Sequence, residues 1–446
     1  MTMHNKVCVI SLGCAKNLTD SEVMLSQLVK NGYELTNSES EADIAVVNTC
    51  CFIDSAKQES IDAILDVAQN KKDGNLKTLI VAGCMGERFK EEVLNELPEV
   101  DAVCGTGDFA DICDIIEKAQ NKRGCYIKGP LNAPLDIADR ILATPPYTAY
   151  LKIAEGCSNH CTYCVIPSIR GKYRSRNFDS IISEAEKLAS NGVKELIIIA
   201  QDTSCYGKDL LPRRTLAELL NKLSKIDGIV WIRVHYLYPE EITDELIYEF
   251  KNNNKIVNYF DIPIQHCSDR ILKLMARRTT KAQIEDLISK IKLQIPDAVF
   301  RTSLIVGFPS ETDEEFYELV DFLKKNKLQR VGAFPYSCEE GTVAASMKDQ
   351  IDDEVKNSRS EKIAENQYDI IDEYCKTKMN LTISVLVEGY DKMLKMYFGR
   401  SYADSVDVDP KIFFSSDNKI EPGAFVNVLI TDNIDCDLVG ILKEES

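Results

Sequence analysis

The stretch Glu155-Gly-Cys-Ser-Asn-His-Cys-Thr-Tyr-Cys164 places three cysteines in one short segment with the spacing C-x3-C-x2-C. Three thiolates so close together are typical of a four-iron cluster whose fourth iron stays open to a ligand that is not protein. A structural zinc site would need four protein ligands. His160 is the candidate for the fourth, but it is adjacent to Cys161, which makes joint tetrahedral ligation awkward. The segment therefore favours an iron–sulfur cluster, with a zinc knuckle as the alternative.

Composition places the chain among globular proteins of two or three domains, with 446 residues and an apolar fraction of 44%. No apolar run approaches the length of a membrane span, and Met1–Lys6 shows no signal-peptide layout. We therefore expect a cytoplasmic protein without a membrane partner. In that compartment, sixteen cysteines indicate metal or redox chemistry rather than disulfides. A net charge of −18 disfavours broad capture of nucleic acid and permits a basic protein partner.

Three further cysteines follow predicted strands in the first third of the chain. Strand-like segments at 6–12, 43–48 and 78–82 alternate with helical patterns, which predicts a parallel α/β sheet over residues 1–125. The carboxyl ends of parallel strands share one edge. That edge collects Cys14, Cys50 and Cys84. This is a second set of three thiols, although each alone could be a small residue in a turn. The remaining cysteines of this region are interpreted as structural: Cys8, Cys51, Cys104, Cys113 and Cys125.

The middle of the chain predicts a barrel. Residues 126–146 are interpreted as a linker because they are rich in proline and lack helical periodicity. Six strand–helix units follow within residues 147–378, which predicts a partial (β/α)6 barrel with its chemistry at the carboxyl ends of the strands. The cysteine loop follows the first of these strands. The basic run Arg170–Arg176 lies near the same face, and its sequence fits an anion-binding site and a solvated loop equally well.

The tail changes character after a long polar helix. Short alternating strands with glycine and proline between them predict a small antiparallel β-barrel over residues 379–446. This segment holds six Lys and Arg against twelve Asp and Glu, a net charge of −6. A barrel that binds RNA should be basic. The tail is better suited to a basic protein partner.

These features together resemble the radical S-adenosylmethionine methylthiotransferases over almost the full length. The C-x3-C-x2-C loop resembles their radical signature, the spread cysteines resemble their auxiliary-cluster domain, and the tail resembles their TRAM domain. One branch of that family modifies adenosines in transfer RNA, and another modifies an aspartate of ribosomal protein S12. Five strings are similar to the second branch: Ser11-Leu-Gly-Cys-Ala-Lys-Asn17, Gln201-Asp-Thr-Ser-Cys-Tyr-Gly207, Asp261-Ile-Pro-Ile-Gln-His266, Val331-Gly-Ala-Phe-Pro-Tyr-Ser337 and Gly399-Arg-Ser-Tyr-Ala-Asp404. Ala15 departs from the proline expected beside Cys14.

The resemblance implies two 4Fe-4S clusters and S-adenosylmethionine as cofactors. Cys157, Cys161 and Cys164 would hold the cluster that binds S-adenosylmethionine, and Cys14, Cys50 and Cys84 would hold the auxiliary cluster that carries sulfur. A radical is the fitting reagent, since an aspartate β-carbon C–H is not acidic enough for a side-chain base. A deoxyadenosyl radical would abstract this hydrogen, sulfur would be inserted, and a second S-adenosylmethionine would supply the methyl group. No side-chain acid or base is predicted.

Further contacts and partners also follow from the resemblance. Candidate contacts for S-adenosylmethionine are Tyr163, Gln201, Gln265 and Gly307. The implied partners are ribosomal protein S12, free or on the small subunit, and an electron donor such as flavodoxin or ferredoxin; the sulfur donor stays open. Three alternatives also stay open: a transfer-RNA methylthiotransferase acting on an N6-modified adenosine, a radical enzyme that only methylates, and a zinc scaffold.

Overall fold

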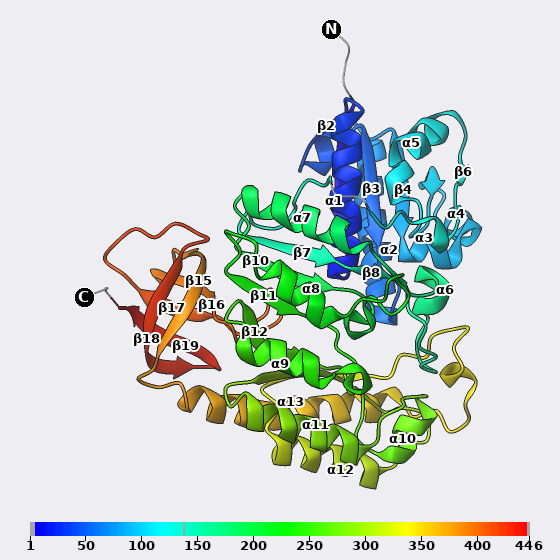
Figure 1. The fold of residues 1–446 in the computed structure, drawn as a ribbon. Coiled ribbons are helices and arrows are strands. Elements are labelled where there is room, and N and C mark those ends of the chain that lie inside the picture. The colour runs from blue at the N-terminus through cyan, green and yellow to red at the C-terminus, as the bar shows by residue number, and fades with distance from the viewer. Residues whose placement is uncertain (1–4, 137–138, 444–446) are drawn as a thin grey trace.

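The computed structural model describes residues 5–136 and 139–443 and contains three domains in chain order (Figure 1). The N-terminal domain lies above the central one, and the C-terminal barrel lies at the side, reached by one long helix. Within the described ranges, no helix is long and apolar enough to cross a membrane.

The N-terminal domain is a parallel sheet of six strands in the order β2-β1-β3-β4-β5-β6. Helices cover both faces: α1 and α5 pack on one, and α2, α3 and α4 on the other. Two buried faces explain why β3 and β4 are fully buried. The elements are β1 (Lys6–Ser11), α1 (Ala15–Lys30), β2 (Glu34–Leu35), β3 (Ile44–Thr49), α2 (Asp54–Asp73), β4 (Thr78–Gly83), α3 (Cys84–Phe89), α4 (Glu91–Glu96), β5 (Ala102–Val103), α5 (Ile112–Asn121) and β6 (Gly124–Cys125).

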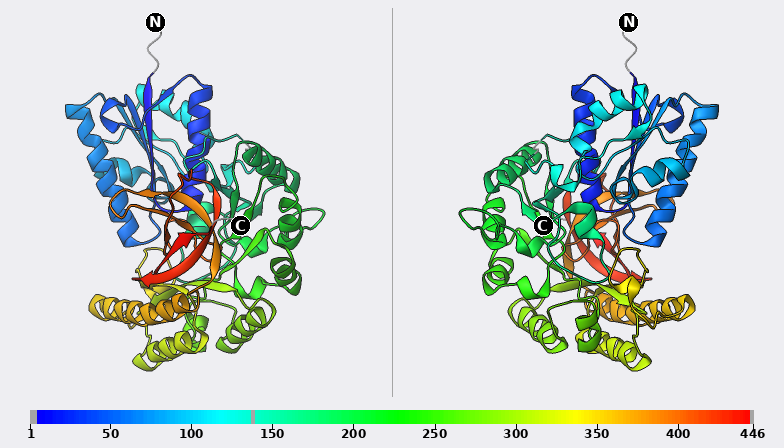
Figure 2. Two further views of the ribbon diagram at one scale, coloured as in Figure 1. Left: turned by 90° about the vertical axis from the view of Figure 1, so that its left-hand side faces the viewer. Right: turned by 90° about the vertical axis from the view of Figure 1, so that its right-hand side faces the viewer.

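The central domain confirms the predicted partial barrel. Its six parallel strands have the order β14-β13-β12-β11-β10-β7, and the sheet stays open between β7 and β14. Helices line its outer side (Figure 2), and capping boxes begin α8, α11 and α12. The strands are β7 (Thr148–Lys152), β10 (Glu195–Ile199), β11 (Trp231–Val234), β12 (Ile256–Asp261), β13 (Val299–Val306) and β14 (Arg330–Pro335). The helices are α6 (Ile166–Arg170), α7 (Phe178–Ser190), α8 (Leu216–Leu223), α9 (Asp244–Asn252), α10 (Asp269–Leu274), α11 (Lys281–Gln294) and α12 (Asp313–Asn326), and a short ribbon pairs β8 (Ala154–Glu155) with β9 (Arg174–Ser175).

The C-terminal domain is a closed barrel of five strands, which confirms the small β-barrel predicted from the tail. The helix α13 (Asp353–Lys376) leads into it. The sequence pattern predicts strands at 381–387, 396–401, 425–430 and 438–442, which correspond to β15, β16, β18 and β19. It missed β17, which pairs antiparallel with β16 but parallel with β19, so the barrel is not antiparallel throughout as predicted. The strands are β15 (Thr382–Asp391), β16 (Met396–Arg400), β17 (Ile412–Ser415), β18 (Phe425–Ile434) and β19 (Asp437–Leu442).

Buried ion pairs join the C-terminal domain to the central sheet. Arg400 at the end of β16 donates to Glu195 at 2.7 Å, and Glu195 also accepts from Arg233 at 3.0 Å. Asp404 accepts from Arg330 at 2.6 Å. Burial alone would raise the pKa of Glu195, but the two arginines lower it to about 2. The C-terminal domain therefore supplies charges that the central domain needs, because a buried charge without a partner is costly.

Candidate functional site

Cys14, Cys50 and Cys84 meet at one edge of the N-terminal sheet. Cys14 directly precedes α1, Cys50 directly follows β3, and Cys84 begins α3 immediately after β4. Gly13 permits this approach: it has φ +83°, and a Cβ there would lie 2.6 Å from the Cβ of Cys50. Burial raises the pKa of the Cys84 thiol, and Cys14, Cys51 and Cys50 add to that effect. We call Cys14, Cys50 and Cys84 the dispersed triad.

Two cations set the charge of this triad. Burial by itself would raise the pKa of the Cys14 thiol, but Lys16 and Arg170 outweigh burial and the pKa is lowered. An acidic thiol is suited to binding iron, because the thiolate is the ligand. Cys51, predicted to be structural, is fully buried in the apolar core, and burial raises its pKa to about 12; burial also raises the pKa of Cys50 and Cys84, so Cys14 alone has a lowered pKa among these four thiols.

Cys157, Cys161 and Cys164 lie in the loop between β8 and α6, and we call them the loop triad. Backbone N–H groups point at two of its sulfurs: Asn159 donates to the sulfur of Cys157 and Ile166 to that of Cys164, each at 3.4 Å. Such N–H···S bonds are a normal feature of cluster thiolates and stabilise their charge. The donor set therefore fits an iron–sulfur cluster.

Within residues 5–136 and 139–443, no three His, Cys, Asp or Glu side chains lie close enough together to hold a single metal ion.

Arg170 links the two triads. Its buried guanidinium donates to Asp20 at 2.8 Å, to Glu155 at 3.3 Å and to Asn17. It also lies 3.7 Å from the sulfur of Cys84. Arg170 ends the helix after the loop triad, whereas Asp20 and Asn17 belong to α1 beside the dispersed triad. One side chain therefore bridges the central and N-terminal domains.

Lys152 and Gln201 complete this junction. Lys152 donates to Asp20 at 2.5 Å and to Glu155 at 2.7 Å, and Gln201 donates to Glu155 at 2.6 Å. Burial would raise the pKa of Glu155, but the two cations Lys152 and Arg170 lower it instead. Glu155 is therefore an ionised carboxylate two residues before Cys157, and it fixes the start of the loop triad. No pattern in the sequence indicated a role for Lys152, Glu155 or Asp20, because the three side chains meet only in the folded chain.

The predicted contacts for S-adenosylmethionine all lie at carboxyl ends of central strands or in the loop itself. Tyr163 packs on a small apolar cluster that contains Met275 and Phe308. Gln201 follows β10, and its buried carbonyl oxygen has no hydrogen-bond partner in the described structure. Gln265 has φ +69° and bridges to β13. Gly307 has φ +70° and follows β13.

Gly307 has a structural reason to be glycine apart from any ligand. A Cβ at this position would lie 2.3 Å from the Cγ of Lys356 on α13. The residue therefore lets α13 approach the carboxyl edge of the sheet, in addition to whatever contact it makes with a cofactor.

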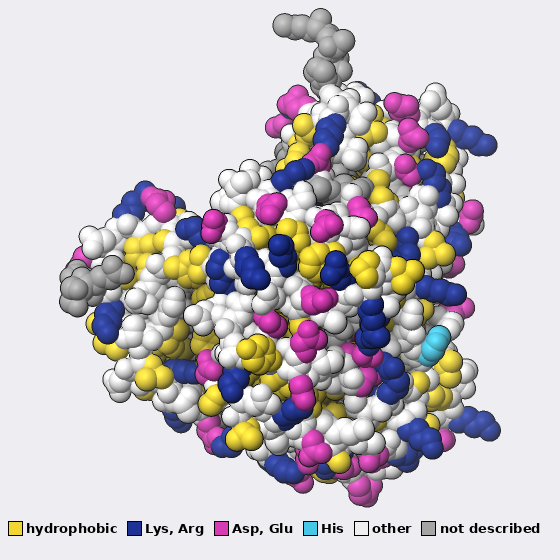
Figure 3. Space-filling model, viewed as in Figure 1, with side chains coloured by type: hydrophobic (Ala, Val, Ile, Leu, Met, Phe, Trp, Pro, Cys, Tyr) yellow, Lys and Arg dark blue, Asp and Glu magenta, His cyan; other side chains and the backbone are white. Residues whose placement is uncertain are grey.

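The structure supports neither interpretation of the basic run Arg170–Arg176, the anion-binding site or the solvated loop. Arg170 and Arg176 are buried, and Arg176 pairs with Glu184 at 2.6 Å. Arg174 donates to the backbone carbonyls of Pro130 and Leu131. The run is neither a free anion site nor a solvated loop, since its arginines bind a carboxylate and backbone carbonyls of neighbouring segments. Figure 3 likewise shows acidic and basic side chains interspersed on the face in view rather than a basic stripe.

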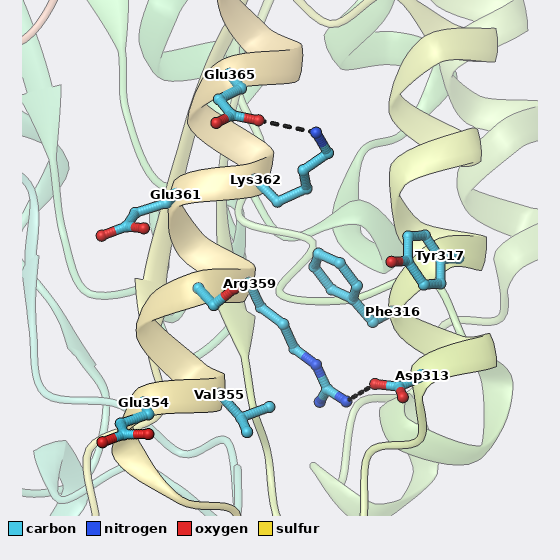
Figure 4. A pocket seen from close by; sticks show the side chains of 10 residues that line it. Asp313, Phe316, Tyr317, Glu354, Val355, Arg359, Glu361, Lys362 and Glu365 are labelled. Carbon is cyan, nitrogen blue, oxygen red and sulfur yellow. Dashed lines mark hydrogen bonds and ion pairs between the residues drawn. The ribbon is translucent and has the colours of Figure 1, made fainter.

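A cavity of about 510 Å³ lies between α12 and α13, away from both triads. Figure 4 shows ion pairs among its lining side chains: Arg359 donates to Asp313 at 2.7 Å, and Lys362 donates to Glu365 at 2.8 Å. None of the six triad cysteines lines it. We therefore place the candidate site at the junction of the triads.

Comparison with known proteins agrees with the three domains. Residues 6–105 match the Uncharacterized protein family UPF0004, residues 151–323 match the Radical SAM superfamily, and residues 381–442 match the TRAM domain. Ribosomal protein uS12 methylthiotransferase RimO of Acetivibrio thermocellus is 47% identical over 452 residues and covers 100% of both chains. The proteins of the same name from Clostridium botulinum and Caldanaerobacter subterraneus are 48% and 50% identical, over 99% and 97% of this chain and 99% of each relative. The chain belongs to the RimO family.

As a member of the RimO family, the chain is a radical S-adenosylmethionine transferase whose family uses S-adenosylmethionine and 4Fe-4S clusters. The transfer-RNA alternative is not favoured, because these full-length relatives carry the ribosomal-protein name. Among solved structures, the radical S-adenosylmethionine methyltransferase TsrM from Kitasatospora setae aligns with 74% of this chain and 72% of its own, with a TM-score of 0.56 and 14% identity. That likeness shows a shared fold.

Proposed function

We propose that this enzyme converts an aspartate of ribosomal protein uS12 to 3-methylthio-aspartate. The observation that carries the proposal is the junction of Arg170, Glu155 and Asp20, which holds two separate cysteine triads together. The names of the full-length relatives support the same substrate. An enzyme that only methylates would have no need for the dispersed triad.

Each of the two triads holds a different cluster. In our proposal, Cys157, Cys161 and Cys164 hold one 4Fe-4S cluster, and Cys14, Cys50 and Cys84 hold the auxiliary one. When bound, these groups and S-adenosylmethionine supply a radical for hydrogen abstraction, a sulfur atom for insertion and a methyl group. The chain orients them: Arg170, Lys152 and Glu155 fix the first loop against the edge of the N-terminal sheet.

The carboxyl edge of the central sheet would bind S-adenosylmethionine. Gln201 has an unpartnered buried carbonyl oxygen there, which suits a hydrogen-bond donor of the cofactor. Tyr163 offers an aromatic face beside Met275 and Phe308, suited to contact with the adenine ring. Gln265 and Gly307 lie at positive φ next to this edge, and we assign them weaker contacts with the cofactor.

Domain limits and partners complete the proposal. We keep the division into 1–125, a linker at 126–146, a radical domain at 147–378 and a TRAM-type barrel at 379–446. The acidic tail suits a basic ribosomal protein, free or in the small subunit. A flavodoxin or ferredoxin would supply single electrons. Such partners place the enzyme in the cytoplasm.

Mass spectrometry of cells with and without the gene tests this function. Peptides of uS12 and, in parallel, bulk transfer RNA are compared between the two strains. We expect a methylthio mass increment on an aspartate peptide that disappears on deletion and returns when the gene is restored. An unchanged uS12 peptide with loss of methylthio-adenosine would assign the enzyme to transfer RNA instead.

A further inference from the structure

Lys16 is a buried cation without a carboxylate partner. It lies in the first turn of α1, two residues after Cys14, and is only 9% exposed. Its ammonium lies over the ring of Tyr236, 3.5 Å from the centroid. In the described part of the chain, no Asp or Glu lies within ion-pair distance of it. Buried lysines are normally paired, because an unpaired ammonium in a protein interior is costly.

The neighbouring cations make the contrast clear. Lys152 and Arg170 share the two carboxylates of Asp20 and Glu155, so these four charges balance. Lys16 stands outside this set of carboxylates, and the groups beside it are the Cys14 thiol and the Tyr236 side chain.

Asp261, at the end of the neighbouring strand β12, is the acidic side chain near Tyr236, and other groups occupy its carboxylate. Its carboxylate accepts the backbone N–H of Tyr236 at 3.0 Å and faces Arg301 at 3.9 Å. It therefore does not neutralise Lys16 by direct contact.

The ring that Lys16 covers, that of Tyr236, lies at the carboxyl edge of the central sheet. Tyr236 follows β11, and its backbone carbonyl accepts the N–H of Thr203 at 3.0 Å. Thr203 is two residues after Gln201, which binds Glu155 at the start of the loop triad. The Thr203 hydroxyl and the Gln201 carbonyl oxygen are both buried without partners in the described structure. Lys16 is thus connected through Tyr236 and Thr203 to the segment of Gln201, whose amide contacts Glu155 at the start of the loop triad.

We propose that Lys16 binds the side-chain carboxylate of the substrate aspartate. This inference rests on the proposed function, since it names what that substrate meets. A carboxylate held by Lys16 would place the adjacent β-carbon beside Cys14 and between the two triads. The same contact would exclude asparagine, because an amide leaves the buried ammonium without a counter-charge. Lys16 is thereby a residue that determines specificity, separate from the cysteines.

A binding comparison tests the inference directly. Purified uS12 and its variant with asparagine at the target position are titrated against the reconstituted holoenzyme and against Lys16→Gln, with affinity read by fluorescence anisotropy. A charge-assisted hydrogen bond makes wild type prefer aspartate roughly 10- to 100-fold. Lys16→Gln should lose this preference while binding the asparagine variant as wild type does, and Lys16→Arg should keep part of it. The interaction between the two changes isolates the contact.

Two controls separate the possible failures. Lys30→Gln removes an exposed lysine from the last turn of the same helix and should change nothing. The midpoint potential of the auxiliary cluster, measured for Lys16→Gln, reports whether the lysine serves the cluster instead. If Lys16→Gln weakens both uS12 forms equally, or keeps the preference for aspartate, the inference is overturned although the proposed function stands. If wild type leaves uS12 unmodified, the proposed function itself fails and takes this inference with it.

Discussion

The two cysteine triads are brought together in opposite ways. The loop triad lies within one segment, where backbone N–H groups of the same loop reach Cys157 and Cys164. The dispersed triad spans the chain from Cys14 to Cys84, and only the parallel order of β1, β3 and β4 unites it. The loop triad thus needs a local conformation, whereas the dispersed triad needs a folded sheet.

The cations beside the triads come from both domains. Lys16 and Arg170 lower the pKa of Cys14 despite its burial, whereas burial raises the pKa of Cys50 and Cys84 as it does that of Cys157, to about 11, and that of Cys164, to about 12. Arg170, one of the two cations beside Cys14, belongs to the central domain. Both triads therefore depend on domain contact, since Asp20 of α1 also pairs with the Lys152 and Arg170 that hold Glu155.

The largest effect should come from the loop triad. Cys157→Ala removes a ligand of the radical cluster, so reductive cleavage of S-adenosylmethionine should fall to background. Deoxyadenosine formation, measured by liquid chromatography, checks this. Cys113→Ala, which removes a half-buried thiol outside both triads, should cleave as wild type does. Persistent cleavage in Cys157→Ala would show that the loop triad is not the radical site.

The second-largest effect should distinguish the roles of the two triads in the reaction. Cys50→Ala should stop sulfur insertion into uS12 while cleavage of S-adenosylmethionine continues without it, because the loop triad is intact. Both products are measured in the same reaction. Thiolated uS12 from Cys50→Ala would remove the dispersed triad from the mechanism.

A third prediction tests the bridge between the triads. Arg170→Met leaves Asp20 and Glu155 sharing only Lys152, and breaking a buried ion pair in this way costs about 3–5 kcal/mol of stability. Anaerobic chemical denaturation measures this loss. The matched control is Arg270→Met, whose half-exposed pair with Glu315 should cost about 1 kcal/mol or less. Equal losses in the two variants would mean that Arg170 does not join the domains.

The smallest effect concerns cofactor binding next to the junction. Gln201→Ala removes one hydrogen bond to Glu155 and the unpartnered oxygen beside it. A loss of about 1 kcal/mol corresponds to a roughly fivefold weaker affinity for S-adenosylmethionine. Equilibrium dialysis measures it, with the exposed Gln58→Ala as control. Unchanged affinity in Gln201→Ala would exclude Gln201 as a contact.

The fold was largely predictable, because strands such as β10 are buried apolar runs between polar turns. The patterns at 195–200 and 300–306 predict strands, and β10 and β13 lie there. Periodicity failed at β17, a strand of four residues among irregular segments. It also gave no sign that Arg400 would enter the central domain to meet Glu195.

The site was predictable only in part, for a physical reason. Cysteine spacing and strand ends indicated both triads, since metal-binding residues leave a pattern in the sequence. Lys152 and Asp20 leave none, because each is an ordinary charged residue until the domains meet, and Arg170 was indicated only as part of a basic run. A chain that ended after α13 would also leave Glu195 with one arginine fewer. The central domain therefore depends on an ion pair with a residue that lies beyond its own segment of the sequence.

Iron content of three proteins tests the central claim most directly. Wild type, the triple alanine variant of Cys14, Cys50 and Cys84, and the triple alanine variant of Cys157, Cys161 and Cys164 are reconstituted anaerobically and analysed for iron and by electron paramagnetic resonance. Two clusters predict about eight iron atoms in wild type and about four in each variant, with two distinct reduced signals. If either variant keeps the full iron content, or if one variant loses all of it, the account of two independent cluster sites is contradicted.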